Sequence, residues 1–394
     1  MKLLSVNAGS SSLKFRLFEM PEEKVIMKGL FERIGFDGAS YEIKMGDTKF
    51  EKKVELKDHN DAVKYLIEEL LENKVIDSLE ELEAVGHRVV HGGSKYASSV
   101  EITDDVIATV EELSDLAPLH NPGCLKGIKA FKEGTNARMV ACFDTAFHQT
   151  MEKSTYMYSV PYEWYEKHGV RKYGFHGLSH KFVSEQMNEK LGKKANLIIC
   201  HIGSGASISA VKEGVCIDTS MGFTPNAGIM MGTRSGDIDY SLINYVMKKE
   251  NLTLEEVDNK LNKVSGLEGI AGMNDLRDID EGFINGDEKV VLAMEMYTNR
   301  IVEYVSKYFV KLNGEVDAMV FTAGVGENDD IVRAEVLKKL TALGIVLDEE
   351  VNKETVTRKG KEGIITKEES SIPVYVLGTD EELMIARDTF NIVQ

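Results

Sequence analysis

Two arginines lie in segments where a phosphate oxygen could reach their guanidinium groups. Arg88 interrupts the apolar, β-branched run GHRVVHGG, and a buried arginine needs an anion as its partner, either a structural carboxylate or a ligand. Arg234 lies between two glycines in MMGTRSGDID, where it either meets a ligand or pairs with Asp237 or Asp239. Because a guanidinium is a planar fork of donors that matches phosphate oxygens, the two arginines could clamp a phosphoryl group during its transfer.

Other polar side chains stand at positions typical of ligand contacts. Asp144 in CFDTAFH follows a predicted strand, and its carboxylate either meets a ligand at the strand end or caps a helix. His176 in YGFHGLSH and His120 in PLHNPG have glycine or turn residues beside them, so both are candidates for ligand contact. His87 and His91 would share one strand face, but zinc would need a third ligand with suitable spacing.

The chain contains an internal repeat of a strand–turn–strand unit. Residues 3–19 read LLSVNAGSSSLKFRLFE and residues 197–213 read LIICHIGSGASISAVKE, an offset of 197 − 3 = 194 residues. The repeat aligns Gly9 with Gly203, Ser10 with Ser204, and Glu19 with Glu213. A Gly-Ser turn presents backbone N–H groups to an anion, so two facing turns could hold a polyphosphate, although two ordinary hairpins would give the same pattern.

Two further segments carry weaker signals, and no G-x-x-x-x-G-K-[ST] is present to indicate a P-loop. Gly324-x-Gly326 follows a predicted strand and either lets an adenosine lie against the backbone or forms a tight turn. Thr379 and Glu382 predict a capping box at the start of a C-terminal helix. That leaves Glu381 either to complement the helix dipole or to help hold Mg²⁺.

Amphipathic helices alternate with short apolar strands, which predicts α/β layers. The helices are expected at residues 60–74 and 331–343. The strands are expected at residues 3–7, 138–143, 196–201, 317–322 and 373–377. A length of 394 residues, at about 150 residues per domain, predicts two or three domains.

The composition is that of a globular protein with an acidic surface. The 65 Asp and Glu residues outnumber the 47 Lys and Arg residues, and the formal charge is −18, which repels nucleic acid and anionic membranes. The four cysteines form no C-x-x-C pair and are expected to be reduced thiols. The opening MKLLSVNAGSSS has too short an apolar stretch for a signal peptide, and no apolar run of about 18 residues occurs, so we expect a cytoplasmic protein.

Taken together, these motifs resemble those of the acetate/propionate/butyrate kinase family, within the actin–hexokinase–heat-shock-chaperone superfamily. The matching segments follow family order over nearly the whole chain, and several are long and unusual. They are VNAGSSSLKF (6–15), GHRVVHGG (86–93), LAPLHNP (116–122), FDTAFH (143–148), RKYGFHGLSH (171–180), HIGSGAS (201–207), DTSMGFTP (218–225), MMGTRSGDID (230–239), FTAGVGEN (321–328) and EELMIARDT (381–389).

The resemblance implies an α/β fold of two duplicated ribonuclease-H-like (actin-like ATPase) domains with a central interdomain cleft that holds ATP. Residues 1–149 plus 380–394 would form the N-terminal domain, with the acid-binding side and the first phosphate turn. Residues 150–379 would form the C-terminal domain, with the second phosphate turn, the nucleotide site and a dimer interface. The resemblance also implies a homodimer.

The resemblance assigns roles to residues by their positions in these motifs. Asn7 and Glu381 would hold Mg²⁺, with Mn²⁺ as an alternative ion. The catalytic group comprises Asp144, Arg88, Arg234 and His176, of which His176 and Arg234 would stabilise the transition state. The pocket for the acid comprises Arg88, Val90, Leu119, Phe175 and Pro225. The nucleotide and phosphate contacts are Ser10, Ser12, Lys14, His201, Gly203, Ser204, Gly205, Gly324 and Gly326.

The chain departs from the family pattern at a few positions. Ser204 replaces an asparagine of the second phosphate motif, which bears on ATP binding and on the choice of phosphoryl donor. Asn226-Ala227 replaces Leu-Glu, and Glu268 interrupts an apolar pair. Asp380 replaces an asparagine and adds negative charge beside the proposed metal ligand.

The implied activity is reversible, Mg-dependent transfer of a phosphoryl group from ATP to acetate by direct in-line attack, giving acetyl phosphate and ADP. Propionate kinase activity is the near alternative. A sugar kinase on the same fold would need a base for its hydroxyl substrate, with Asp144 as the candidate. A non-enzymatic actin-like or chaperone-like ATP switch would need polymer contacts or an appended peptide-binding domain.

Overall fold

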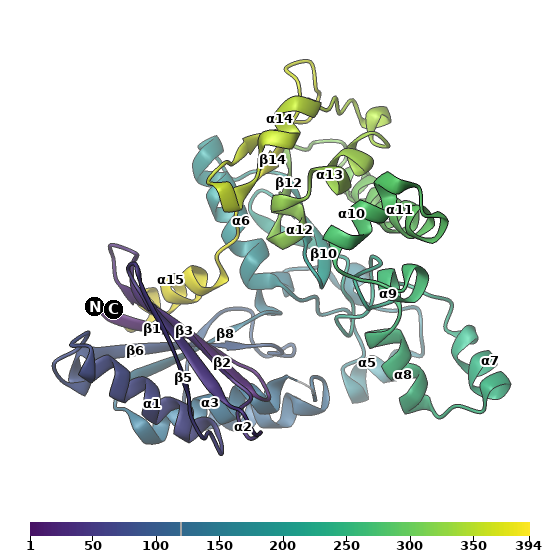
Figure 1. The fold of residues 1–394 in the computed structure, drawn as a ribbon. Helices are drawn as coiled ribbons and strands as arrows, with labels where there is room; N and C mark the ends of the chain where they lie inside the picture. Colours follow the sequence, from purple (N-terminus) through teal and green to yellow (C-terminus); the bar gives the residue numbers. More distant parts are fainter. Residues whose placement is uncertain (119) are drawn as a thin grey trace. The chain divides into compact units, whose positions relative to one another are not determined.

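A computed structural model of the chain describes residues 1–118 and 120–394, which divide into two compact units. Unit 1 comprises Met1–Gln149 together with Asp380–Gln394, and unit 2 comprises Thr150–Thr379. Figure 1 draws both units, with labels on many of their helices and strands. Leu119, assigned above to the acid pocket, lies outside the described residues.

Unit 1 is built on a mixed sheet with the strand order β5-β4-β3-β2-β1-β6-β8-β7. Its strands are β1 (Lys2–Ala8), β2 (Ser12–Glu19), β3 (Lys24–Glu32), β4 (Ser40–Met45), β5 (Thr48–Lys53), β6 (Leu82–Val89), β7 (Val100–Glu101) and β8 (Arg138–Phe143). Strand β1 pairs antiparallel with β2 and parallel with β6, and β6 pairs parallel with β8. The carboxyl ends of β1, β6 and β8 therefore meet at one edge of the sheet.

Helices cover both faces of this sheet, with α1 and α3 on one side and α15 on the other (Figure 1). The helices of unit 1 are α1 (His59–Glu72), α2 (Asp104–Glu112), α3 (Asn121–Gly134) and α15 (Glu381–Val393). The apolar stripe of α1 includes Val63, Leu66 and Leu70, which are buried in the core beneath the sheet. Helix α15 contacts β1, β6 and β8, so it returns the end of the chain to unit 1.

The close contact between α15 and β6 depends on a glycine in the strand. A Cβ built on Gly86 would lie 2.2 Å from Thr389 Oγ1 and 2.6 Å from Ile385 Cγ2. Both of those residues belong to α15 and are buried. Because no real Cβ tolerates such distances, the helix can sit this near to the sheet only above a residue without a side chain.

Unit 2 repeats the central topology of unit 1. Its strands are β9 (Leu197–Ile202), β10 (Ala206–Lys212), β11 (Val215–Thr219), β12 (Ala318–Thr322), β13 (Gly363–Ile364) and β14 (Val374–Val376), in the order β11-β10-β9-β12-β14-β13. Strand β9 pairs antiparallel with β10 and parallel with β12, and β12 pairs parallel with β14. The strands β3-β2-β1-β6-β8 and β11-β10-β9-β12-β14 thus share order and direction, which is the ribonuclease-H-like arrangement and confirms the predicted duplication.

The helices of unit 2 vary widely in length. They are α4 (Lys153–Tyr156), α5 (Tyr162–His168), α6 (Gly177–Leu191), α7 (Ser241–Glu250), α8 (Leu254–Lys263), α9 (Gly266–Ala271), α10 (Leu276–Asn285), α11 (Glu288–Lys311), α12 (Ala323–Asn328), α13 (Asp330–Leu337) and α14 (Glu349–Glu354). The long helix α11 packs against α9, α10 and α13 and reaches the sheet at β9 and β10. The first turn of α6 lies beside β9, and α12 follows β12 directly.

The five predicted strands are confirmed as β1, β8, β9, β12 and β14, and the helix predicted at residues 60–74 is confirmed as α1. The helix predicted at 331–343 is too long, because α13 ends at Leu337 and the chain continues as a 3₁₀ turn at Thr341–Leu343. That turn closes at Gly344, whose φ of 73° lies in the left-handed region.

The predicted capping box at the start of α15 is wrong. The N-cap residue is Asp380, and its carboxylate accepts a hydrogen bond from the Leu383 amide at 2.9 Å. The Thr379 hydroxyl instead lies 2.8 Å from Ser179 Oγ. Because the carboxylate of Asp380 already satisfies the helix amide, the Glu382 side chain is available for an ion pair with Lys14.

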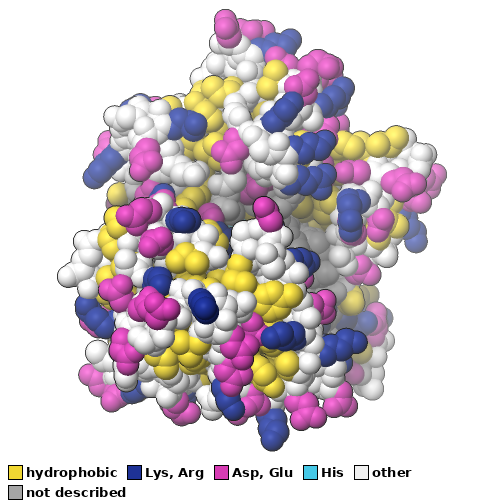
Figure 2. All heavy atoms as spheres, turned by 60° about the vertical axis from the view of Figure 1, so that its left-hand side comes forward, with side chains coloured by type: hydrophobic (Ala, Val, Ile, Leu, Met, Phe, Trp, Pro, Cys, Tyr) yellow, Lys and Arg dark blue, Asp and Glu magenta, His cyan; other side chains and the backbone are white. Residues whose placement is uncertain are grey.

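Surface charge and thiols agree with the composition. Acidic and basic side chains are interspersed over the face shown in Figure 2. All four cysteines are described, buried and outside any disulfide. Among the described residues, no helix combines the length and the apolar character that a membrane crossing requires.

Replacement of Gly86 by alanine is expected to lower the free energy of unfolding by about 1–3 kcal/mol, because the added methyl group overpacks the contact between β6 and α15. Urea unfolding followed by circular dichroism measures this loss. Gly324→Ala in α12 is the matched control, since its Cβ would meet no described atom within 4 Å. The control should keep or raise stability, as alanine favours helix. Equal losses in both variants would contradict the role given to Gly86.

Candidate functional site

In unit 1, Arg88 and Asp144 meet at the ends of two adjacent parallel strands. Arg88 is next to last in β6, Asp144 follows the last residue of β8, and the register pairs Arg88 with Cys142. The Arg88 guanidinium donates from Nε to Asp144 Oδ1 at 3.0 Å and from Nη2 to Oδ2 in a second, shorter contact. The predicted anionic partner of Arg88 is therefore present as a carboxylate, while 22% of the arginine side chain remains exposed to a ligand.

Asn7 and Glu381 complete this cluster, which we call the Arg88 cluster. Arg88 Nη1 lies 3.5 Å from Asn7 Oδ1, and Arg88 Nε lies 4.0 Å from Glu381 Oε2. Burial and the negative charge of Asp144 raise the pKa of the Glu381 carboxyl to about 7, although the positive charge of Arg88 acts to lower it. Burial disfavours the charge of Arg88, yet the two carboxylates raise its pKa above the ordinary value. The guanidinium is thus a fixed positive charge.

The donor set of the Arg88 cluster fits a magnesium ion that is shared with a substrate. Mg²⁺ prefers hard oxygen ligands and is usually held by one or two carboxylates together with phosphate oxygens and water. Glu381 offers a carboxylate and Asn7 an amide oxygen. In the described part of the chain, no set of three or more His, Cys, Asp or Glu side chains is arranged to hold a metal.

The first Gly-Ser turn is held from two sides. Gly9 N donates to Ser12 O at 2.9 Å, and His59 Nε2 donates to Gly9 O at 2.9 Å. A Cβ built on Gly123 at the start of α3 would lie 2.7 Å from the Gly9 carbonyl carbon, so the helix packs directly on the turn. Ser10 is exposed at its tip. Sequence reasoning missed His59, because a histidine in the first turn of an amphipathic helix gives no local signal of a tertiary contact.

Lys14 lies on β2 rather than in the turn itself, and its ammonium group forms an ion pair with Glu382. Arg16 on the same strand pairs with Asp380 at 2.6 Å and with Glu382 at 3.4 Å. The extra negative charge of Asp380 is therefore balanced by Arg16. The acidic start of α15 is held against β2 by these two cations.

In unit 2, His176, His201 and Arg234 gather around the second Gly-Ser turn. A Cβ built on Gly205 would lie 3.4 Å from Arg234 Nη1 and 3.6 Å from His176 Nε2. The rings of His176 and His201 stack with centroids 4.1 Å apart. Gly232 N donates to Ser204 O at 3.2 Å, and this bond ties the segment that carries Arg234 to the turn. We call this group the Arg234 cluster.

Arg234 has no carboxylate partner among the residues that the structure describes. Its Nη1 donates to Pro225 O at 3.2 Å, and burial lowers the pKa of the guanidinium. The alternative pairing with Asp237 does not form, because the Asp237 carboxylate accepts from Gly228 N and from Tyr304. This guanidinium is therefore left with donor capacity for an incoming anion.

The backbone of His176 is held in an uncommon conformation. His176 is the N-cap residue of α6 and has a φ of 60°, in the left-handed region that favours glycine. Its Nδ1 lies 2.9 Å from Ser207 Oγ, and His201 Nδ1 lies 2.7 Å from Ser179 Oγ. Such strain persists where surrounding contacts define the conformation, and it is common at functional sites.

The remaining predicted residues fall into a pocket group and a nucleotide group. Val90 and Phe175 are buried, and Pro225 is half-buried. Gly324 and Gly326 lie in α12, so the tight-turn alternative is wrong. A Cβ on Gly326 would lie 3.4 Å from the Phe321 carbonyl carbon, which indicates a packing role for this glycine, whereas Gly324 faces open space within the described structure.

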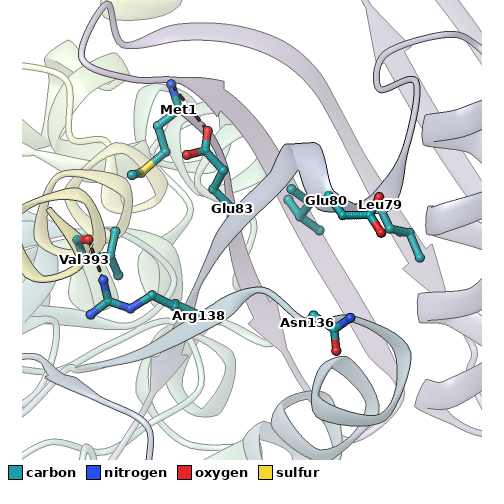
Figure 3. Close-up of a pocket in the computed structure, with 8 residues that line it drawn as sticks. Met1, Leu79, Glu80, Glu83, Asn136, Arg138 and Val393 are labelled. Carbon is teal, nitrogen blue, oxygen red and sulfur yellow. Dashed lines mark hydrogen bonds and ion pairs between the residues drawn. The ribbon is translucent and has the colours of Figure 1, made fainter.

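A separate cavity in unit 1 contains none of the predicted site residues. It has a volume of about 390 Å³ and is lined by Met1, Leu79, Glu80, Leu82, Glu83, Asn136, Arg138 and Val393. Figure 3 shows Arg138 pointing to the Val393 carbonyl and the Met1 amine pointing to Glu83. Arg138, Glu83 and the Met1 amine are thus paired within the chain.

Comparisons with known proteins point in one direction. The acetokinase family model matches residues 2–387. The acetate kinase of Anoxybacillus flavithermus is 52% identical over 396 residues, covering 99% of this chain and 98% of that protein. The acetate kinase structure from Porphyromonas gingivalis matches with a TM-score of 0.94 at 45% identity, covering 100% of both chains. A propionate kinase structure from Francisella tularensis matches with a TM-score of 0.93 at 41% identity, covering 99% of both chains.

Replacement of Asp144 by alanine is expected to lower the free energy of unfolding by about 3 kcal/mol or more, because it leaves the Arg88 charge without its main partner. Urea unfolding measures the loss. Glu101→Ala is the matched control, since Glu101 forms the same two-bond contact with Arg138 at 2.8 and 2.9 Å but on the surface. An exposed pair contributes little, so the control should resemble the parent protein. A stable Asp144→Ala variant would contradict the dependence of Arg88 on Asp144.

Proposed function

Because the chain belongs to the acetokinase family, we propose that it transfers the γ-phosphoryl group of MgATP reversibly to acetate, giving acetyl phosphate and ADP. The observation that carries this proposal is the full-length similarity, at about half of all positions, to relatives named acetate kinase. The two arginine clusters support it, since Arg88 lies beside oxygen donors that suit a metal ion and Arg234 lies beside the second Gly-Ser turn. The step we propose is direct in-line attack of a carboxylate oxygen on the phosphorus, with ADP as the leaving group.

The chemistry needs charge neutralisation rather than a base. Acetate is already ionised at pH 7, so no proton has to be removed before attack. The barrier lies in bringing two anions together, and fixed positive groups lower it. Asp144 is engaged by Arg88 through both of its oxygens, so we assign it a role in positioning that arginine. The same engagement disfavours the sugar-kinase alternative, in which Asp144 would act as a base.

We assign the contacts with the two substrates to both clusters. Arg88 would bind the carboxylate of the acid, because its side chain is partly exposed and its charge is fixed. Arg234 and His176 would donate to the oxygens of the phosphoryl group as charge builds up on them, since Nη1 and Nε2 face the same space at Gly205. Val90, Phe175 and Pro225 would surround the methyl group of acetate.

Asn7 and Glu381 would hold Mg²⁺, and Mn²⁺ has the same preference for hard oxygen ligands. When bound, the ion would neutralise charge on the ATP phosphates. Ser10, Ser12 and Lys14 would contact phosphate from unit 1. His201, Gly203, Ser204 and Gly205 would do so from unit 2, and Gly324 and Gly326 would lie against the nucleoside.

The proposed division of labour follows the two units. Unit 1 would carry the acid-binding side and the first phosphate turn, and unit 2 would carry the second turn and the nucleotide. We also propose a cytoplasmic homodimer in which unit 2 forms the interface. Helix α7 supports this, because none of its ten residues, all of them described, is buried, and Tyr240 and Tyr245 beside and within it are 82% and 65% exposed.

A hydroxylamine trap tests the proposed activity directly. The full chain is incubated with MgATP, a candidate acceptor and hydroxylamine, which converts an acyl phosphate to a hydroxamate. A hydroxamate with acetate, and none with sugars, would support acetate phosphorylation. Slow ATP hydrolysis without hydroxamate would instead support a non-enzymatic ATP switch. Parallel reactions with GTP and pyrophosphate would show whether Ser204 changes the choice of donor.

Arg88→Ala and Arg234→Ala are each expected to lower kcat by at least about 100-fold, because each removes a positive group that acts mainly in the transition state. The KM for ATP should change little in both variants. Steady-state kinetics measure both constants. Arg138→Ala, which removes an arginine paired on the surface with Glu101, serves as the control and should keep full activity. Near-normal turnover in both cluster variants would refute the assigned roles.

The acid pocket is expected to favour acetate over propionate by about tenfold in kcat/KM, the usual effect of one methylene in an apolar pocket. Val90 should set this limit, because a buried β-branched side chain cannot swing aside. Val90→Ala should therefore bring the ratio towards one, mainly by improving the constants for propionate. Equal kcat/KM values for both acids in the parent protein would favour the propionate kinase alternative.

A further inference from the structure

A chain of hydrogen bonds leads from the ring of His176 into the interior of unit 2. Ser207 Oγ lies 2.9 Å from His176 Nδ1 and 2.8 Å from His180 Nε2. Ser209 Oγ lies 2.7 Å from His180 Nδ1. His180, Ser207 and Ser209 are fully buried. Sequence analysis singled out only His176 from this group.

The spacing of the two histidines along α6 matches the spacing of the two serines along β10. His176 and His180 are four residues apart at the start of α6, which corresponds to about 6 Å along the helix axis. Ser207 and Ser209 are two residues apart on one face of β10, which corresponds to about 6.8 Å along the strand. These two distances are nearly equal, so each histidine meets a serine when the helix packs on the strand. HGLSH and SIS are the sequence patterns that encode this match.

The number of hydrogen atoms limits how the chain can be ordered. A serine hydroxyl has one hydrogen, and a neutral imidazole has one N–H. In one order, His180 donates from Nε2 to Ser207, Ser207 donates to His176 Nδ1, and the hydrogen of His176 is on Nε2. In the reverse order, His176 donates from Nδ1 to Ser207, and its Nε2 has a bare lone pair. If both rings donated to Ser207, its buried hydroxyl hydrogen would lack an acceptor among the residues that the structure describes, which is unfavourable.

The surroundings of His176 Nε2 favour the first order once an anion is bound. This nitrogen and Arg234 Nη1 both approach Gly205, at 3.6 and 3.4 Å from its ideal Cβ position. A phosphoryl oxygen in that space would accept from both groups, whereas a bare nitrogen lone pair would repel it. The stacked ring of His201 is oriented separately, through Ser179 and Thr379.

We propose that Ser207, His180 and Ser209 are positioning residues that hold the hydrogen of His176 on Nε2, so that His176 donates to the transferring phosphoryl group. Ser207 is the central member because it contacts both rings. Ser209 fixes the far end, where it donates to His180 Nδ1 in this order. The catalytic part of this inference rests on the proposed phosphoryl transfer, while the hydrogen-bond order can be tested without any reaction.

The tautomer of His176 is measured by long-range ¹H–¹⁵N NMR of the full-length protein, labelled at its histidines and saturated with inorganic phosphate as the anion. The pH is set about two units above the ordinary histidine pKa of about 6.5, so that an unperturbed ring is neutral. Comparison with His176→Gln identifies the signals of His176. We expect the Nε2–H form in the parent protein and a mixture of both forms in Ser207→Ala. A parent protein with the hydrogen on Nδ1, or a Ser207→Ala variant with an unchanged tautomer, would overturn the proposal.

Kinetics test the consequence for catalysis. Ser207→Ala should lower kcat by about tenfold or more while the KM for ATP stays within about twofold, because a transition-state donor is lost. Ser207→Thr keeps the hydroxyl and should restore both kcat and the tautomer. A simple packing defect would not follow the hydroxyl in this way, so failure of Ser207→Thr to restore kcat in a folded protein would overturn the role.

Ser5→Ala is the matched control, because Ser5 is a fully buried strand serine whose hydroxyl has no partner in the described structure. It should change neither kcat nor the tautomer. If Ser207→Ala does not fold, Ser209→Ala tests the same chain from its far end and should shift the His176 tautomer to a smaller extent. An unchanged tautomer there would overturn the proposal. If the parent protein forms no acetyl phosphate, the proposed function fails, and the NMR result still decides the hydrogen-bond order.

Discussion

A buried positive charge needs a negative partner, and the functional part of unit 1 is organised around that need at Arg88. The parallel register of β6 and β8 brings Asp144 to the guanidinium, where two hydrogen bonds form. Glu381 approaches the same group because α15 docks on β6 over Gly86. The sheet register, Gly86 and helix α15 thus together place two carboxylates beside Arg88, whose charge is fixed and whose side chain remains partly exposed to a ligand.

Unit 2 leaves the same need unmet within the described structure. Arg234 extends from a loop, and the structure describes no carboxylate that contacts it. The loop is instead held by backbone hydrogen bonds, from Gly232 N to Ser204 O and from Met231 N to Arg234 O. Burial then destabilises the guanidinium charge, as the direction of its pKa shift shows. An anion bound beside Gly205 would relieve this cost. The charge of Arg234 is therefore the one that a bound substrate would stabilise most.

The sequence predicted the elements that depend on local pattern and missed those that depend on packing. Apolar runs and Gly-Ser turns were enough to place β1, β9 and the other predicted strands. The capping box failed because Thr379 and Asp380 both suit an N-cap, and only tertiary contacts decide between them. His180 and Ser207 were assigned no role of their own from the sequence. Their contact requires a helix turn and a strand to lie side by side, which no single segment encodes.

The duplication shows how the two halves came to differ. In the repeat, Val6 aligns with Cys200, and their parallel partners are His87 and Phe321. The next residues along these two strands, Arg88 and Thr322, therefore correspond to each other. When the pairing of β6 with β8 is compared with the pairing of β12 with β14, Asp144 corresponds to Thr379.

In unit 2 these two threonines lie near a single acid, since Thr379 N donates to Glu327 Oε1 at 3.0 Å and Thr322 Oγ1 lies 3.5 Å from the same atom. The two strand-end positions therefore hold an arginine and an aspartate that form an ion pair in unit 1, and two uncharged threonines that contact Glu327 of α12 in unit 2. The cation of unit 2 had to come from outside the repeated strands, and it comes from the loop of Arg234.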